Sequence, residues 1–133
     1  MTPVHHGSCL CGAVRYEVHG AIRDSIACHC SQCRKTSGHY WSATSARLGD
    51  VRIQESGGLR WFRSSDHARR GFCQHCGSSL FWQPDGADTL SIGSGTLDTS
   101  IGLTTLCHIF VADKADYVDI APGLPQWPHE RTG

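Results

Sequence analysis

The sequence predicts a mainly β protein built from short antiparallel strands, and three observations favour this fold class. Short runs rich in β-branched and aromatic residues recur along the 133-residue chain. Clusters of glycine, aspartate and serine separate these runs, as turns between strands do. The stretches that could be helical are too short to cover a sheet. We therefore expect a single domain over residues 1–133, with a core at about 7–125 and a proline-rich C-terminal tail.

The expected strands follow one another along most of the chain. They cover residues 13–18, 40–46, 51–54, 59–63, 79–83, 89–92, 107–111 and 117–120. Turn residues stand between several of them, at Gly49-Asp50, Ser56-Gly57-Gly58, Asp85-Gly86 and Gly93-Ser94-Gly95. Two short helical turns are expected, one at Ser31–Ser37 with Ser31 as its N-cap and one at residues 97–101.

The remaining large or unusual side chains have ordinary structural interpretations. Six aromatic residues are expected to form the core and the pocket walls: Trp41, Trp61, Phe62, Phe72, Phe81 and Trp82. Cys107 lies outside the cysteine clusters and is expected to be a small buried apolar residue. Lys114 is expected to be exposed at the end of a strand.

Charge and hydropathy exclude several classes of partner. The 12 Lys and Arg residues balance the 12 Asp and Glu residues, so the chain has no basic surface for nucleic acid or for an acidic membrane. No apolar run follows Met1, and no stretch approaches the ~20 residues that span a bilayer. A cytoplasmic location is expected. In that reducing compartment, clustered cysteines are more typical of metal ligands than of disulfides. A disulfide framework is the alternative.

Four of the eight cysteines are expected to form a structural zinc site. In an extended segment, residues i and i+2 point to the same side, so Cys9 and Cys11 can face one ion. The Cys73-x-x-Cys76 pair, followed by Gly77, resembles a zinc knuckle. Four thiolates complete the coordination of zinc, which is typical of a structural site. Such a site would join the N-terminal strand to the second half of the chain.

A second cluster, Cys28, Cys30 and Cys33, offers three thiolates and no fourth cysteine at comparable spacing. Zinc held by three protein ligands has one position open for water or substrate, which is typical of catalytic sites. The sequence also permits a closed site with a fourth protein ligand. The candidates for that ligand are His29, His39, His75, His108 and Cys107.

The open site suggests chemistry between thiols and aldehydes. A thiol that coordinates zinc loses its proton, and the resulting thiolate could add to the carbonyl of a small aldehyde to give a hemithioacetal. Arg34 and Lys35 follow the cluster directly and could bind the carboxylates of an acidic thiol such as glutathione. Their alternative role is charge compensation for the thiolates.

Five segments of the chain resemble one known family. They are GSCLCGAVRYEV (7–18), CHCSQCRKTSG (28–38), GFCQHCGSSLFW (71–82), SGTLD (94–98), and HIFVADKADYVDI with GLP (108–125). Together they resemble the glutathione-dependent formaldehyde-activating enzyme family, which also includes centromere protein V.

The resemblance implies a β-tent fold, in which sheets fold over zinc sites. It implies one zinc on Cys9, Cys11, Cys73 and Cys76 and a second zinc on Cys28, Cys30 and Cys33. The activity it implies is that of a carbon–sulfur lyase, which condenses formaldehyde with glutathione to S-hydroxymethylglutathione or cleaves that adduct. The expected partners are thus a small-molecule thiol and an aldehyde, and a homo-oligomer is compatible with the sequence.

Two other functions stay open at this point. One is a non-catalytic, zinc-stabilised binding module, because centromere protein V is in the same family. The other is a thiol or redox sensor, in which the three-thiolate site loses zinc on oxidation.

Overall fold

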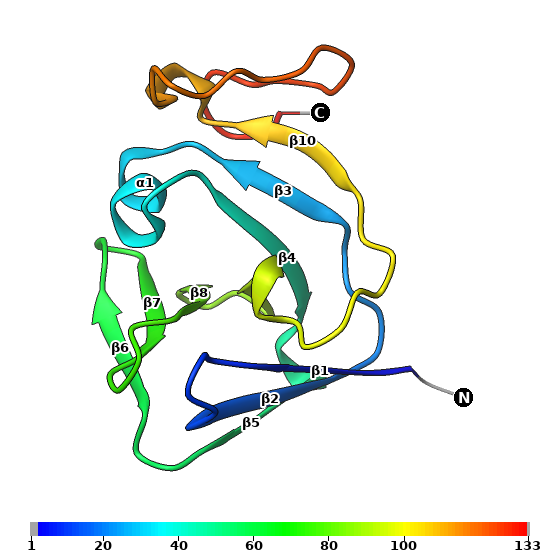
Figure 1. The fold of residues 1–133 in the computed structure, drawn as a ribbon, viewed down its shortest axis with the longest axis vertical. Helices are drawn as coiled ribbons and strands as arrows, with labels where there is room; N and C mark the ends of the chain where they lie inside the picture. Colours follow the sequence, from blue (N-terminus) through cyan, green and yellow to red (C-terminus); the bar gives the residue numbers. More distant parts are fainter. Residues whose placement is uncertain (1–2, 133) are drawn as a thin grey trace.

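Two sheets form the protein in the computed structural model, which describes residues 3–132 (Figure 1). The first has three strands in the order β1-β2-β5, and the second has seven in the order β10-β3-β4-β9-β8-β7-β6. The strands of the first sheet are β1 (Val4–Ser8), β2 (Val14–His19) and β5 (Val51–Glu55). Those of the second are β3 (Ser25–Cys28), β4 (Trp41–Arg47), β6 (Leu59–Arg63), β7 (Ala68–Cys73), β8 (Ser79–Pro84), β9 (Thr89–Gly93) and β10 (Thr105–Ile109). The prediction of a mainly β fold is confirmed.

All strand pairs are antiparallel except one. Strands β3 and β10 lie side by side in parallel, so that Ile109 is the register partner of Cys28. In Figure 1 this pair forms the upper right of the molecule, and α1 lies beside it above β6 and β7. None of the helices in residues 3–132 has the length and apolar character required to cross a membrane.

The one α-helix, α1 (Ser31–Ser37), lies where the sequence predicts it. Its N-cap is Cys30 rather than Ser31, because the sulfur of Cys30 accepts a hydrogen bond from the backbone N–H of Cys33 at 3.3 Å. Gly38 ends the helix at φ 84°, a conformation that glycine adopts without steric cost. Within residues 3–132 there are also three 3₁₀ turns: η1 (Leu48–Asp50), η2 (Ser94–Thr96) and η3 (Val111–Asp113).

The main core lies between the two sheets. On β2, Val14, Tyr16 and Val18 alternate inward and are at most 2% exposed. They pack against buried residues of the second sheet, among them Phe81 and Ile92. The ring of Tyr16 meets Phe81 edge to face at 5.4 Å, a geometry that aromatic pairs favour. This packing holds the N-terminal segment against the second half of the chain.

Some expected elements are absent, and some observed ones were not expected. The expected strand at 117–120 is wrong, because this segment turns instead: the N–H of Val118 bonds to the carbonyl of Ala115 at 3.2 Å. Lys114 is half-buried rather than exposed, and its Nζ donates to the carbonyl of Val118 at 2.7 Å. The expected turn at 97–101 is also wrong, because Leu97 forms a β-bridge with Gly7 and the turn precedes it. Strands β1, β3 and β7 were not predicted.

The proline-rich tail folds back along the edge of β10, where it runs in orange and red above that strand in Figure 1. Backbone hydrogen bonds join residues 125–129 to residues 108–112, for example from the N–H of Phe110 to the carbonyl of His129 at 2.8 Å. Phe110 has φ 56°, the only positive φ among the non-glycine residues that the structure describes. The tail thus covers a strand edge and fixes the backbone at Phe110.

Candidate metal centres and substrate cavity

Two tight turns bring the first four cysteines together. Cys9 follows β1, and a turn that ends at Gly12 (φ 82°) brings Cys11 back beside it. Cys73 ends β7, and the N–H of Gly77 bonds to its carbonyl at 2.7 Å, which closes the knuckle that carries Cys76. Glycine suits both turns because Gly77, at φ 81°, has a positive φ like Gly12. The core packing described above sets these two turns against each other.

The geometry of this cluster fits a tetrahedral zinc ion. All four sulfurs lie within 4.8 Å of one another. The Cys9–Cys11 and Cys11–Cys73 sulfur distances are both 3.7 Å. Four Zn–S bonds of about 2.3 Å in a tetrahedron place their sulfurs about 3.8 Å apart, whereas a disulfide would require about 2.05 Å. The hydroxyl of Ser78 stabilises a thiolate here and lowers the pKa of Cys76 to about 5. This cluster could therefore hold zinc.

The second cluster is assembled locally, around the start of α1. Cys28 ends β3, Cys30 caps the helix, and Cys33 lies in its first turn. Their sulfurs also lie within 4.8 Å of one another. Hydrogen bonds from the thiols of Cys28 and Cys33 lower the pKa of Cys30 to about 2, whereas the same contacts raise the pKa of Cys28 above its usual range. Three sulfurs this close can all ionise only beside a cation, which is the role that zinc would have.

No fourth Cys, His, Asp or Glu joins this trio of sulfurs among residues 3–132. His29 is fully buried, and its Nε2 lies 2.9 Å from Nδ1 of His108. Burial, with a smaller contribution from His108, lowers the pKa of His29 to about 4. The other candidates for a fourth ligand (His39, His75, His108 and Cys107) are likewise not in the cluster. Cys107 is 2% exposed, as expected for a small buried residue.

The three sulfurs border a cavity of about 470 Å³, which we call the thiolate cavity. Its wall includes two arginines, Arg23 and Arg70, and one carboxylate, Asp113. Nη2 of Arg70 lies 3.5 Å from the sulfur of Cys33. Burial lowers the pKa of Arg23 below its usual value, so an anion that enters the cavity would compensate a charge that is costly to bury.

Arg34 and Lys35, the basic residues expected at the site, are not among the residues that line this cavity. Both lie on α1, where Lys35 is exposed and Nε of Arg34 is buried without a hydrogen-bond partner in the described chain. Arg23, Arg70 and Asp113 were not identified from the sequence. The alternation of side chains in a strand was the one available signal for Arg70, because it sends one of the neighbours Arg69 and Arg70 to each face of β7.

Some of the six aromatic residues expected in the core or at pocket walls line a cavity, and others belong to the main core. Trp41 and Trp82 line the thiolate cavity, while Phe81 and Trp61 belong to the main core. Phe62 is 60% exposed and therefore lies outside the core, but it lines a second cavity, as expected for a wall residue.

Fold and site together define a β protein with two cysteine clusters that could bind metal, one of them beside a cavity. The comparisons with known proteins agree with this class. Residues 4–113 match the model of the family described as glutathione-dependent formaldehyde-activating enzyme, and the chain belongs to that family. It is similar to an uncharacterized lyase of Schizosaccharomyces pombe, with 26% identity over 120 residues, covering 90% of this chain and 87% of the relative.

The fold also has a counterpart among solved structures. The crystal structure of a Rhodobacter sphaeroides protein superposes with a TM-score of 0.61 and covers 92% of this chain and 98% of its own. At 24% sequence identity, this likeness concerns the fold alone.

Proposed function

We propose that this protein is a zinc-dependent carbon–sulfur lyase that forms or cleaves adducts of glutathione with formaldehyde or another small aldehyde. The observation that carries the proposal is the trio Cys28, Cys30 and Cys33, whose sulfurs converge at the edge of a cavity without a fourth protein ligand in the described chain. Family membership and the lyase relative support the same class of reaction.

Two zinc ions per chain are part of this proposal. Cys9, Cys11, Cys73 and Cys76 would hold one as a structural ion, since four thiolates complete its coordination. Cys28, Cys30 and Cys33 would hold the other. Bound there, zinc would favour loss of the proton from a thiol that enters the cavity. Arg34 and Lys35 lie near this cluster in the sequence, and we assign them to charge compensation for its thiolates.

The proposed reaction needs no redox partner. The sulfur of the thiol forms a bond to the carbonyl carbon of the aldehyde, the C=O double bond becomes a C–O single bond, and the thiol proton ends on that oxygen. The product from formaldehyde and glutathione is S-hydroxymethylglutathione, and the lyase direction reverses each change. Holding both reactants side by side accounts for much of the acceleration that such a site can give.

Glutathione carries two carboxylates and one ammonium group, and the wall of the thiolate cavity offers a charged partner for one carboxylate and one for the ammonium group. In this proposal Arg23 binds a carboxylate, and Asp113 accepts hydrogen bonds from the ammonium group. Arg70, which lies beside the sulfur of Cys33, donates a hydrogen bond to the aldehyde oxygen as negative charge develops on it.

Exchange spectroscopy by NMR tests the proposal with glutathione and formaldehyde as reactants. We expect the zinc-loaded protein to accelerate exchange between free and adduct forms at least tenfold over the spontaneous rate, and Cys30→Ser to return it to that rate. Cys107→Ser makes the same chemical change at a buried cysteine outside the clusters and should keep the acceleration. A zinc-loaded protein that leaves the spontaneous rate unchanged would refute the assignment.

A further inference from the structure

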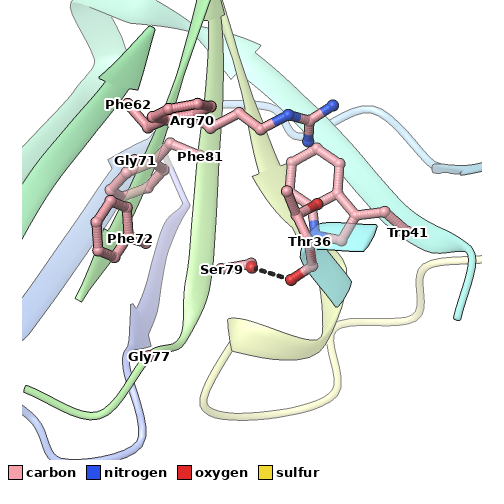
Figure 2. Close-up of a pocket in the computed structure, with 9 residues that line it drawn as sticks. All are labelled: Thr36, Trp41, Phe62, Arg70, Gly71, Phe72, Gly77, Ser79 and Phe81. Atoms are coloured by element: carbon pink, nitrogen blue, oxygen red, sulfur yellow. Dashed lines mark hydrogen bonds between the residues drawn. The ribbon is translucent and has the colours of Figure 1, made fainter. Parts of the chain in front are cut away.

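A second cavity, which we call the aromatic cleft, shares Arg70 and Trp41 with the thiolate cavity. It has a volume of about 270 Å³ and lies between α1 and strands β6 to β8. Figure 2 shows Arg70 reaching toward Trp41, while Phe62 and Phe72 lie on the side of the cleft away from Trp41. The hydroxyl of Ser79 donates to the carbonyl of Thr36 at 2.9 Å and so joins the sheet to the helix beneath the cleft.

Strand register explains why two phenylalanines and an arginine share this face. Phe62 on β6 is the register partner of Arg70 on β7, and Arg60 is the partner of Phe72. Residues directly opposite each other in an antiparallel pair point to the same face of the sheet. This face looks toward α1 and away from the main core, and Phe62 is left 60% exposed there. The aromatic cleft is thus an apolar surface beside the candidate catalytic site that the core does not use.

Arg70 is a buried charge with weak partners. It is only 9% exposed, and a guanidinium group carries five N–H donors. Two of its contacts are long, because Nε and Nη2 both reach Oε1 of Gln32 at 3.4 Å. Its other partners are the sulfur of Cys33, 3.5 Å from Nη2, and the ring of Trp41, whose centroid lies 5.6 Å from the guanidinium carbon. Among residues 3–132, no carboxylate forms an ion pair with it. A buried guanidinium with two long hydrogen bonds and no carboxylate partner has donor capacity for an acceptor atom from a ligand.

We infer that the aromatic cleft is a binding subsite for the organic group of an aldehyde larger than formaldehyde, with an aromatic or other apolar substituent. The inference rests on the proposed function. The thiol sulfur lies at the thiolate trio, the carbonyl oxygen accepts a hydrogen bond from Arg70, and the substituent lies between Phe62, Phe72 and Trp41. Formaldehyde has only hydrogen atoms in place of this substituent and leaves the cleft without a ligand group.

The test compares two aldehydes in the same exchange experiment. Rates of glutathione exchange with benzaldehyde and with formaldehyde are measured on the zinc-loaded protein, and their ratio is the readout. We expect Phe62→Ala and Phe72→Ala each to lower the benzaldehyde-to-formaldehyde ratio at least fivefold. Val4→Ala, which shortens a 41% exposed apolar side chain on the other sheet, should leave the ratio unchanged. Phe62 is mostly exposed, so its replacement leaves the core intact.

Acceleration with formaldehyde but not with benzaldehyde would overturn the subsite while the proposed function stands. So would an unchanged ratio in both phenylalanine variants. Acceleration with neither aldehyde refutes the proposed function. The cleft is then tested with benzyl alcohol, an unreactive probe whose binding is followed by NMR through the indole N–H signal of Trp41. Saturable binding that Phe62→Ala weakens at least fivefold supports an aromatic subsite, and an indole signal that does not move overturns it.

Discussion

Replacing Cys9 by serine should remove the zinc ion that we propose joins the two ends of the core. Cys11 and Cys73 are 62 positions apart, so an ion held by both turns closes a long loop in the unfolded chain. The chain-entropy relation used for disulfides gives about 4 kcal/mol for a loop of this length. We expect Cys9→Ser to lower the free energy of unfolding by about this amount, with one zinc ion lost per chain.

Cys107→Ser provides a matched control. Cys9 and Cys107 are 4% and 2% exposed, so both substitutions place a hydroxyl in a buried site. Of these two residues, only Cys9 belongs to a cysteine cluster in the described chain. The control variant should lose about 1 kcal/mol, the cost of a buried hydroxyl with a poor partner, and should keep both zinc ions.

Zinc content by mass spectrometry and urea unfolding followed by circular dichroism measure the two quantities. With an m-value of about 2 kcal/mol/M, the midpoint of Cys9→Ser should fall by about 2 M urea and that of Cys107→Ser by about 0.5 M. Equal midpoints, or two zinc ions retained by Cys9→Ser, would show that the four sulfurs do not hold a structural metal.

Three further predictions concern the packing and the titration of single residues. A Cβ at Gly7 would lie 2.0 Å from the ring of Tyr16, so Gly7→Ala should lower the free energy of unfolding in urea by about 3 kcal/mol. Gly49 has open space around it, so the control Gly49→Ala should change that free energy by less than about 0.5 kcal/mol. Equal effects of the two substitutions would contradict this packing. The pKa of His29 is lowered to about 4 in the folded chain. Between pH 6.5 and about 4, the unfolded chain therefore binds a proton at His29 that the folded chain does not bind. The free energy of unfolding should fall as the pH falls through this window. His29→Phe should make that slope shallower by up to about 1.4 kcal/mol per pH unit, and an unchanged slope would count against a neutral buried imidazole. Phe110 has φ 56°, so Phe110→Gly should have a free energy of unfolding about 1 kcal/mol higher than Phe110→Ala, measured by urea unfolding. The reverse order would argue against backbone strain at this position.

The three-cysteine cluster and each of the two cysteine pairs could be predicted from the sequence because their spacing is local. A pair of cysteines two or three positions apart converges through a single turn, whatever the rest of the fold does. Helix α1 was also predicted from a local pattern, although its N-cap is Cys30 and not the expected Ser31.

The strands that were not predicted depend on their neighbours. Strand β7 contains Arg69, Arg70 and Gly71, which are not typical of a central strand. It forms because its partners accommodate these residues. The guanidinium of Arg69 lies over the ring of Trp61 at 3.9 Å, and a side chain at Gly71 would meet Trp61 and Phe81. Such compensation is tertiary and leaves no local pattern.

The wall of the thiolate cavity could not be predicted from local patterns either. Arg23 precedes β3, and Asp113 follows β10, so the two reach the same cavity only because these strands pair. Arg34 and Lys35 were chosen because they are adjacent to the cysteines in sequence. Adjacency on a short helix does not determine which face a side chain occupies, and the two arginines and the carboxylate that line the cavity come from elsewhere in the chain.

The parallel pairing of β3 with β10 has a consequence for biosynthesis. His29 and His108, which touch across this pair, are 79 positions apart, so a ribosome releases the three-cysteine turn long before the strand that will flank it. During that interval the residues Ile109 and Phe110, which line the cavity beside the trio, are not yet in place. The three-cysteine turn can therefore form before the strand that completes the wall of its cavity.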